Sequence, residues 1–144
     1  MSTSRYSWIK VSDIMTMNPI TVSPSETIAN ADDLMFENRI RQLPVVEGKE
    51  LVGIITDRDI RSFLSASALA SPAGREAALN TPVAEIMTRK PVTLSPEDDL
   101  ETAVELMINE KFGGVPVVSA AEGLVGILTY VDVLQCFLYR LQED

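Results

Sequence analysis

The sequence predicts a mixed α/β (α+β) fold made of two pseudo-symmetric β-α-β-β-α repeats, packed face to face through their sheets. The main observation is an internal duplication: residues 11–46 and 83–118 align at a constant offset of 72 and are identical at 14 of 36 positions. One extra residue then enters the second copy, and residues 51–61 and 124–134 continue at an offset of 73 with 6 identities in 11. In both copies, strand-like and helix-like patterns follow one another in the same order.

Each copy opens with a short extended stretch followed by the start of a helix. In the first copy, Pro19–Val22 precedes Ser23-Pro24-Ser25-Glu26. Serine suits the N-cap, proline the first helical position, and glutamate completes a capping box. Apolar residues then recur at helical spacing: Ile28, Ala31, Leu34 and Met35. The second copy repeats this design at Pro91–Leu94 and Ser95–Asp98, followed by Leu100, Ala103, Val104 and Met107.

Two β-rich runs and a second helix complete each copy. In the first copy, residues 43–46 and 51–55 flank a short polar segment with a glycine, which predicts a hairpin. Residues 115–118 and 124–128 are their counterparts. The closing helices have apolar positions at Ile60, Phe63 and Leu64, and at Val133, Leu134, Phe137, Leu138 and Leu141. We expect these residues to pack first into the core, with a surplus face on the last helix.

The repeats divide the chain into an N-terminal segment (1–10), a first repeat (11–64), a connector (65–81) and a second repeat with the C-terminal helix (82–144). A unit of about 50 residues can rarely bury a core alone, so we expect the two copies to share one as a closed pair. The connector is rich in Ala and Ser and is interrupted by Pro72 and Gly74, with helix-favouring residues following at Arg75–Leu79, and we interpret it as a surface connection.

The composition argues against several classes of function. A formal net charge of −9 disfavours binding to nucleic acid or an anionic membrane surface, which requires a positive field. Histidine is absent, which rules out a histidine-based triad, metal site or general base. The single Cys136 excludes an internal disulfide and fits a reducing compartment. No apolar run approaches about 18 residues, so we predict a cytoplasmic protein without a transmembrane helix.

The most informative polar motif is Thr-x-x-Asp, found at Thr56/Asp59 and again at Thr129/Asp132, where a strand passes into a helix. One interpretation is local capping of the helix by the threonine hydroxyl and the carboxylate. The other is ligand binding, because a helix N-terminus can accept a phosphate and a carboxylate can accept both hydroxyls of a ribose. The residues alone leave both interpretations open, since duplication copies a cap as readily as a site.

The two copies resemble cystathionine β-synthase (CBS) domains, which pair as a Bateman module. In the first copy the matching segments are Asp13-Ile14-Met15-Thr16, Pro19-Ile20-Thr21-Val22, Leu43-Pro44-Val45-Val46 and Gly53-Ile54-Ile55-Thr56-x-x-Asp59. In the second they are Glu85-Ile86-Met87-Thr88, Pro91-Val92-Thr93, Val115-Pro116-Val117-Val118 and Gly126-Ile127-Leu128-Thr129-x-x-Asp132. Each motif is weak alone, but their order and spacing, found twice over residues 11–141, are specific.

The resemblance implies binding of an adenosine-containing ligand (AMP, ADP, ATP or S-adenosylmethionine) in a cleft between the copies. The aspartate would hold the ribose, the threonine would lie beside the phosphates, and apolar residues would enclose the adenine. Site A is implied to contain Ile54, Thr56, Arg58, Asp59, Val92, Gly113, Gly114, Val115 and Pro116. Site B is implied to contain Met15, Ile20, Arg41, Gln42, Leu43, Pro44, Ile127, Thr129 and Asp132.

The two implied sites are not equivalent. The second copy has Gly113-Gly114 and Tyr130-Val131 where the first has Arg41-Gln42 and Asp57-Arg58. The two arginines are candidates for phosphate neutralisation because a guanidinium pairs bidentately with phosphate; the alternative is a solvated surface arginine. Asp57 could disfavour a highly charged phosphate tail or meet it through Mg²⁺. We therefore expect unequal affinities.

The sequence thus predicts a regulatory module that senses an adenosine-type ligand and signals to an unidentified partner by conformational change. The resemblance also implies a homodimer. The alternative is a structural or protein-interaction scaffold in which the Thr/Asp pairs are only caps. An enzyme is not expected, because no metal-ligand cluster or nucleophile–base pair stands out, and Thr56 and Thr129 lack an activating base.

Overall fold

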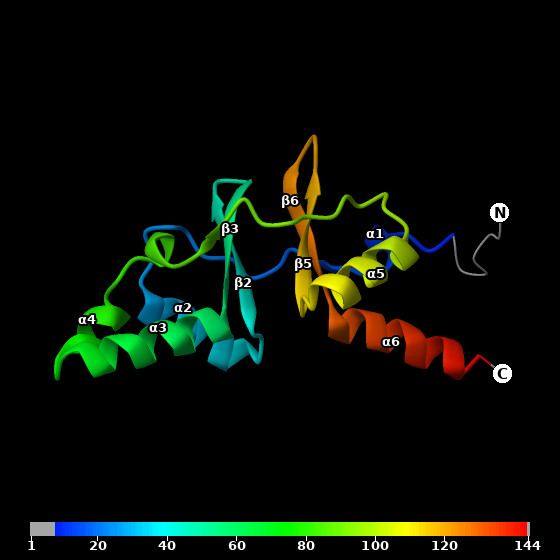
Figure 1. Ribbon diagram of the computed structural model, residues 1–144. Coiled ribbons are helices and arrows are strands. Elements are labelled where there is room, and N and C mark those ends of the chain that lie inside the picture. Colours follow the sequence, from blue (N-terminus) through cyan, green and yellow to red (C-terminus); the bar gives the residue numbers. More distant parts are fainter. Residues whose placement is uncertain (1–7, 144) are drawn as a thin grey trace. The chain divides into compact units, whose positions relative to one another are not determined.

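Two three-stranded sheets and the helices packed on them form the computed structural model, which describes residues 8–143 (Figure 1). This arrangement confirms the mixed α/β class. The chain divides into two compact units: Ile20–Pro91, and a second unit that joins the chain up to Pro19 with Val92–Asp144. Each unit therefore combines parts of both sequence repeats. The predicted N-terminal segment, residues 1–10, lies outside the described residues except for residues 8–10.

The unit Ile20–Pro91 contains an antiparallel sheet in the order β2-β3-β4. Its elements are α2 (Ile28–Asn38), β2 (Gln42–Glu47), β3 (Glu50–Thr56), α3 (Asp57–Ala70), α4 (Gly74–Leu79), the 3₁₀ turn η1 (Val83–Glu85) and β4 (Thr88–Arg89). β2 and β3 form the predicted hairpin, and Gly48 adopts a positive φ in its turn. The core joins Leu43 and Ile55 from the hairpin to Ile28 and Ile60 from α2 and α3.

The other unit has the sheet order β1-β6-β5. Its elements are α1 (Val11–Ile14), β1 (Thr16–Met17), α5 (Leu100–Glu110), β5 (Gly114–Ser119), β6 (Gly123–Thr129) and α6 (Tyr130–Leu141). β5 and β6 form the second predicted hairpin. The core contains Val115, Val117 and Leu128 from this hairpin together with Val11 and Ala103 from α1 and α5.

A short strand from each repeat pairs with the hairpin of the other repeat. β1 belongs to the first repeat but pairs with β6, and β4 belongs to the second but pairs with β3. Two glycines permit this close approach. A Cβ on Gly53 would lie 2.9 Å from the Thr88 carbonyl oxygen, and one on Gly126 would lie 2.8 Å from that of Thr16. The glycine in the repeated Gly-x-x-Thr segment is therefore required by strand pairing.

The first helix of the first repeat begins later than its Ser-Pro signal predicts. The Glu26 N–H donates to the Ser23 carbonyl at 3.1 Å, which makes this segment a turn. The helix starts at Ile28 after Thr27, whose hydroxyl is the actual N-cap acceptor. The reason is tertiary, because the Ile28 N–H donates to the Thr81 carbonyl at 2.9 Å and holds the chain extended just before the helix.

The second repeat shows the same correction. The Asp98 N–H donates to the Ser95 carbonyl at 3.1 Å, and the helix starts at Leu100 after Asp99 in an extended conformation. Here the Leu100 N–H donates to the Ile9 carbonyl at 3.0 Å. In both repeats, the first helical residue donates a hydrogen bond to a backbone segment distant in the sequence. This bond keeps the preceding residues out of the helix, which therefore starts later than predicted.

The last helix differs from expectation, whereas the predicted connector, residues 65–81, contains helix where its sequence favours helix. α3 continues to Ala70 and α4 covers Gly74–Leu79; Ala78 of α4 is buried in the core. On α6 no residue is fully buried. The expectation that its apolar residues pack first into the core is therefore wrong for most of them; Val133 packs against the core, whereas Phe137 and Leu138 are exposed.

Candidate functional site

The N-terminus of α3 is closed by two reciprocal hydrogen bonds between Thr56 and Asp59. Thr56 Oγ1 accepts from the Asp59 N–H at 3.1 Å, and Asp59 Oδ2 accepts from the Thr56 N–H at 3.0 Å. This geometry is a capping box, which satisfies two backbone donors at the helix start. The capping interpretation is confirmed here. It does not compete with ligand binding, because among the described residues nothing donates to the other carboxylate oxygen, Oδ1.

The N-terminus of α6 has the same capping box with additional bonds. Asp132 Oδ2 accepts from the Thr129 N–H at 2.8 Å and from Thr129 Oγ1 at 3.1 Å. Thr129 Oγ1 also accepts from the Asp132 N–H at 3.4 Å. In addition, Thr16 Oγ1 donates to Asp132 Oδ1 at 2.9 Å. The two Thr-x-x-Asp motifs thus share their caps but differ in how fully the carboxylate is occupied.

The apolar residues implied for the two sites lie on both faces of the sheets. Pro44 pairs with Ile54, and Pro116 pairs with Ile127. Because side chains alternate along a strand, these pairs lie on the face opposite to the neighbouring core residues. Leu43 and Val115 are such core residues, at 0% and 1% exposure. Their side chains belong to the hydrophobic cores and are therefore not available to a ligand.

The segment before β2 lies beside the start of α3. The Asp57 N–H donates to the Arg41 carbonyl at 2.8 Å, and Gln42 pairs with Thr56. Arg41 and Gln42 were implied for site B and Thr56 for site A, yet the structure brings them together in one unit. The second copy has the same backbone bond, from the Tyr130 N–H to the Gly113 carbonyl at 3.0 Å. In the second copy, Gly113 and Gly114 stand where the first copy has Arg41 and Gln42, so these positions have no side chains.

The residues implied for each site belong to both units. For site A, Ile54, Thr56, Arg58 and Asp59 lie in Ile20–Pro91, and Val92, Gly113, Gly114, Val115 and Pro116 lie in the other unit. For site B, Ile20, Arg41, Gln42, Leu43 and Pro44 lie in Ile20–Pro91, and Met15, Ile127, Thr129 and Asp132 lie in the other unit. Within each unit, the structure gathers one Thr-x-x-Asp motif and one segment preceding the hairpin.

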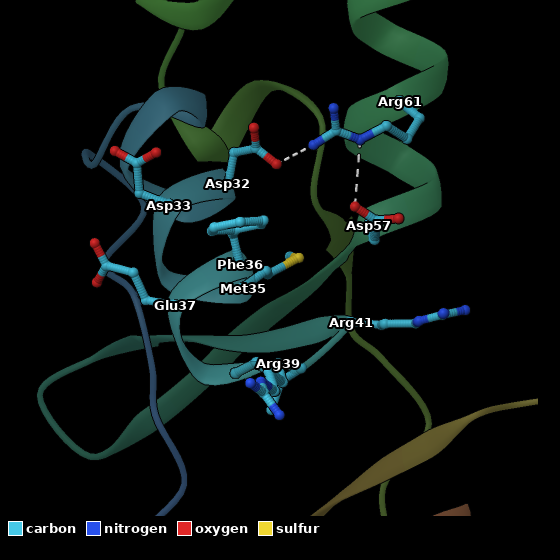
Figure 2. A pocket seen from close by; sticks show the side chains of 10 residues that line it. Asp32, Asp33, Met35, Phe36, Glu37, Arg39, Arg41, Asp57 and Arg61 are labelled. Atoms are coloured by element: carbon cyan, nitrogen blue, oxygen red, sulfur yellow. Dashed lines mark hydrogen bonds and ion pairs between the residues drawn. The ribbon is translucent and has the colours of Figure 1, made fainter.

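A charged hollow of about 810 Å³ lies beside α2 and α3 (Figure 2). It is lined by Asp32, Asp33, Met35, Phe36, Glu37, Arg39, Ile40, Arg41, Asp57 and Arg61. The Arg61 guanidinium contacts Asp32, and its Nε lies 3.3 Å from Asp57 Oδ1. Arg41 extends away from these ion pairs (Figure 2). The sequence interpretation missed this group, although the Asp57–Arg61 spacing of i,i+4 is a recognisable helical ion-pair signal.

Two further properties of the described residues bear on the site. Between residues 8 and 143, no cluster of three or more His, Cys, Asp or Glu side chains could hold a metal ion. Over the same range, no helix is long and apolar enough to cross a membrane.

Both repeats, each with a strand–helix junction closed by Thr-x-x-Asp, match the model of a known family. The model for the CBS domain matches residues 11–66 and 83–139. The chain therefore belongs to the CBS domain family, with two copies of the domain.

Curated relatives of this chain include longer proteins. The protein MJ1225 from Methanocaldococcus jannaschii is 34% identical over 133 residues, which cover 87% of this chain and 48% of that protein. Inosine-5′-monophosphate dehydrogenase from Korarchaeum cryptofilum is 38% identical over 114 residues, covering 79% of this chain and 21% of the enzyme. The chain thus spans about half the length of the first relative and about a fifth of the second.

Solved structures with the same fold have been obtained with bound adenosine compounds. CBSX2, from Arabidopsis thaliana, in complex with AMP superposes with a TM-score of 0.79 at 31% identity, covering 92% of this chain and 98% of CBSX2. The CBS domain pair of MJ0100, in complex with 5′-methylthioadenosine and S-adenosyl-L-methionine, has a TM-score of 0.73 at 32% identity, with coverage of 92% and 98%.

Proposed function

We propose that this chain is a regulatory module that binds an adenosine-containing ligand, either an adenine nucleotide (AMP, ADP or ATP) or S-adenosylmethionine. The observation that carries the proposal is the pair of capped aspartates, Asp59 and Asp132, at equivalent strand–helix junctions of a CBS pair. Solved relatives at 31% and 32% identity hold AMP and S-adenosyl-L-methionine, which supports this class of ligand.

Each group at the junction has a role that follows from its chemistry. The carboxylate of Asp59 or Asp132 accepts hydrogen bonds from the ribose hydroxyls. The start of α3 or α6 places the positive end of the helix dipole near the phosphates or the ligand's tail. Arg41 and Arg58, both exposed, supply positive charge for a phosphate. Asp57, already bonded to Arg61, is the residue that would meet a longer phosphate tail or its Mg²⁺.

The proposed output is a change of conformation rather than a reaction. A ligand that binds one arrangement of the protein more tightly than another shifts the population toward it, and a partner protein can recognise that shift. Catalysis by this chain is not proposed, because the hydroxyls of Thr56 and Thr129 are engaged in helix caps.

A thermal-shift titration tests the proposal. Purified protein is titrated with AMP, ADP, ATP with and without Mg²⁺, and S-adenosylmethionine, with GTP as the non-adenosine control. A ligand that binds only the folded state raises the melting temperature. At a concentration of 100 Kd it adds about 2.7 kcal/mol to the free energy of unfolding. We expect a selective rise with at least one adenosine compound. A flat response to the whole panel at millimolar concentration would leave the scaffold alternative as the better account.

Matched variants separate a binding role from a capping role. Asp59→Ala and Asp132→Ala should each lose about 1 kcal/mol of stability and also weaken ligand binding. Asp98→Ala is the control: the Asp98 carboxylate accepts from the Ser95 N–H at 2.8 Å, but the residue lies outside the implied sites. It should lose comparable stability and keep its ligand response. Equal ligand responses in all three variants would contradict the proposed role of the two aspartates.

We also propose that the chain forms a homodimer in which the exposed face of α6 takes part. Five apolar residues on this helix are each between 53% and 69% exposed: Leu134, Phe137, Leu138, Tyr139 and Leu141. Leu134, Phe137, Leu138 and Leu141 recur at i, i+3, i+4 and i+7 and so share one face of the helix, and an exposed apolar face of this kind is typical of an interaction site. Leu138→Asp should shift the sedimentation profile toward monomer, whereas Leu69→Asp, which changes an exposed leucine on α3, should not. Identical profiles for the two variants would remove α6 from the interface.

A further inference from the structure

The Asp132 carboxylate is held by a residue that has no equivalent partner at Asp59. Thr16 of β1 donates from Oγ1 to Asp132 Oδ1 at 2.9 Å. Its counterpart at the repeat offset is Thr88 of β4, which lies in the same unit as Asp59. β4 pairs with β3 as β1 pairs with β6. Among the described residues, however, no hydrogen bond joins Thr88 to Asp59, so the duplicated geometry contains this contact once.

The difference matters because a carboxylate has a limited number of acceptor positions, about four over its two oxygens. Asp132 already accepts from the Thr129 N–H, from Thr129 Oγ1 and from Thr16 Oγ1. Asp59 accepts from the Thr56 N–H at Oδ2, and among the described residues this is its one hydrogen-bond donor. A ribose diol donates two hydrogen bonds. Asp59 can accept both as it stands, whereas Asp132 must first release a bond that it already accepts.

Thr16 is the donor whose release costs the motif least. The other two donors, the Thr129 N–H and the Thr129 hydroxyl, both belong to the residue that caps α6 and hold the start of that helix. Thr16 lies instead on an exposed strand of two residues, whose register pairs are Thr16 with Ile127 and Met17 with Gly126. A short edge strand with so few pairings separates more readily than a helix cap.

We infer that Thr16 is a latch on Asp132, which weakens ligand binding at site B and makes the Asp59 site the first to fill. This inference rests on the proposed function, because it assigns the order in which the two aspartates take the ribose. It also gives ligand binding at Asp132 a mechanical consequence: the ribose displaces the Thr16 hydroxyl and frees β1 from its side-chain contact with α6. Thr16 is a positioning residue, since it acts through Asp132.

Isothermal titration with AMP in single-site backgrounds tests the latch. Asp59→Ala isolates the Asp132 site, and Thr16→Val is added to it; Asp132→Ala isolates the Asp59 site, and Thr88→Val is added there as the matched control. We expect Thr16→Val to tighten AMP binding about 3- to 10-fold, the equivalent of one weak hydrogen bond. Thr88→Val should change affinity less than about twofold, and Thr16→Ser, which keeps the hydroxyl, should restore the weaker affinity.

The outcomes separate the latch from the proposed function. Unchanged or weaker AMP binding in the Thr16→Val background, or equal tightening by Thr88→Val, overturns the latch while leaving the proposed function intact. If the wild-type protein binds none of AMP, ADP, ATP and S-adenosylmethionine, the proposed function fails and the ligand role of Thr16 fails with it.

A ligand-free measurement tests the contact itself. In hydrogen–deuterium exchange, Thr16→Val should accelerate exchange of the β1 amides, because the side-chain bond to α6 is lost. Thr88→Val should leave the β4 amides at their wild-type rate, since Thr88 has no such bond to lose. Equal changes in β1 and β4 would show that Thr16 is no more firmly held than its counterpart and would overturn the inference.

Discussion

The two helices that follow the Thr-x-x-Asp motifs, α3 and α6, begin alike and pack differently. Both start from a threonine N-cap with a reciprocal aspartate three residues later. Beyond that first turn, α3 buries Ile60 and Leu64, whereas α6 has no fully buried residue. The duplication has therefore kept the junction and changed the helix face. The part that both copies retain is the part to which we assign ligand binding.

The neighbours of the two helices explain the contrast. α3 packs against α4, which is built from the predicted connector and contributes the buried Ala78. α6 is contacted instead by α1, a single turn of four residues. The longer contact covers one side of α3, while the apolar residues in the second half of α6 remain uncovered in the described structure. This surface is what makes α6 the candidate for self-association.

The largest expected difference between α3 and α6 is in the effect of an alanine substitution at Leu64 and at its counterpart Phe137. Leu64 is 2% exposed and Phe137 is 59% exposed. Leu64→Ala should destabilise the protein by about 2–5 kcal/mol, because it leaves a cavity. Phe137→Ala should change monomer stability by less than about 0.5 kcal/mol. Urea unfolding at two protein concentrations measures both, since a loss through the dimer depends on concentration. A concentration-independent loss at Phe137 as large as that at Leu64 would place α6 in the core.

The next largest effect is expected to be similar in the two copies, because it concerns a glycine that both copies need for strand pairing. Gly53→Ala and Gly126→Ala should each destabilise by about 1–3 kcal/mol, because the added Cβ meets a backbone carbonyl that can move only with its strand. The Cβ would also meet Met87 Sδ at 2.6 Å and Met15 Sδ at 2.7 Å, respectively. Gly113→Ala is the control, since its Cβ would meet nothing within 4 Å. Thermal denaturation should show similar losses for the first two variants; a neutral Gly53→Ala would argue against the pairing of β4 with β3.

The smallest effect concerns a contact found in one copy. Arg61 contacts Asp32 and Asp57, and its counterpart in the second copy is Leu134. Arg61→Ala should lose at most about 1 kcal/mol, because the side chain is about half exposed and its ion pairs are screened. The loss should shrink in 1 M NaCl. Arg75→Ala, on an exposed position of α4, is the reference. A salt-independent loss at Arg61 would mean that its aliphatic stem, not its charge, stabilises α2 and α3.

Much of the fold follows from local patterns in the sequence. The hairpins are encoded by short apolar runs around polar turns, and the caps of α3 and α6 by Thr-x-x-Asp, so both could be predicted. The starts of α2 and α5 could not. Ser23 and Ser95 carry a valid capping signal, but backbone bonds from Ile28 to Thr81 and from Leu100 to Ile9 override it. Such pairings are decided by residues remote in the sequence.

The residues of the candidate site stay a prediction, but the neighbours that the fold gives them within each unit could not be predicted from the sequence. Thr56 and Arg41 were implied for different sites, yet the hairpin register brings their segments together. The roles of β1 and β4 could not be anticipated, because two-residue strands carry no alternation pattern. The contact from Thr16 to Asp132 depends on that pairing, which is why no property of Thr16 in the sequence distinguishes it from Thr88.

The exchange of β1 and β4 between repeats has a consequence for synthesis of the chain. Ile20–Pro91 is continuous, so it can close soon after Pro91 leaves the ribosome. Thr16, by contrast, must wait for its register partner Ile127. At translation rates of about 5–20 residues per second, that wait lasts roughly 5 to 20 seconds. During it, Val11, which ends in the core, has no partner to bury it. Residues 8–19 are thus made before Ile20–Pro91 but placed after it.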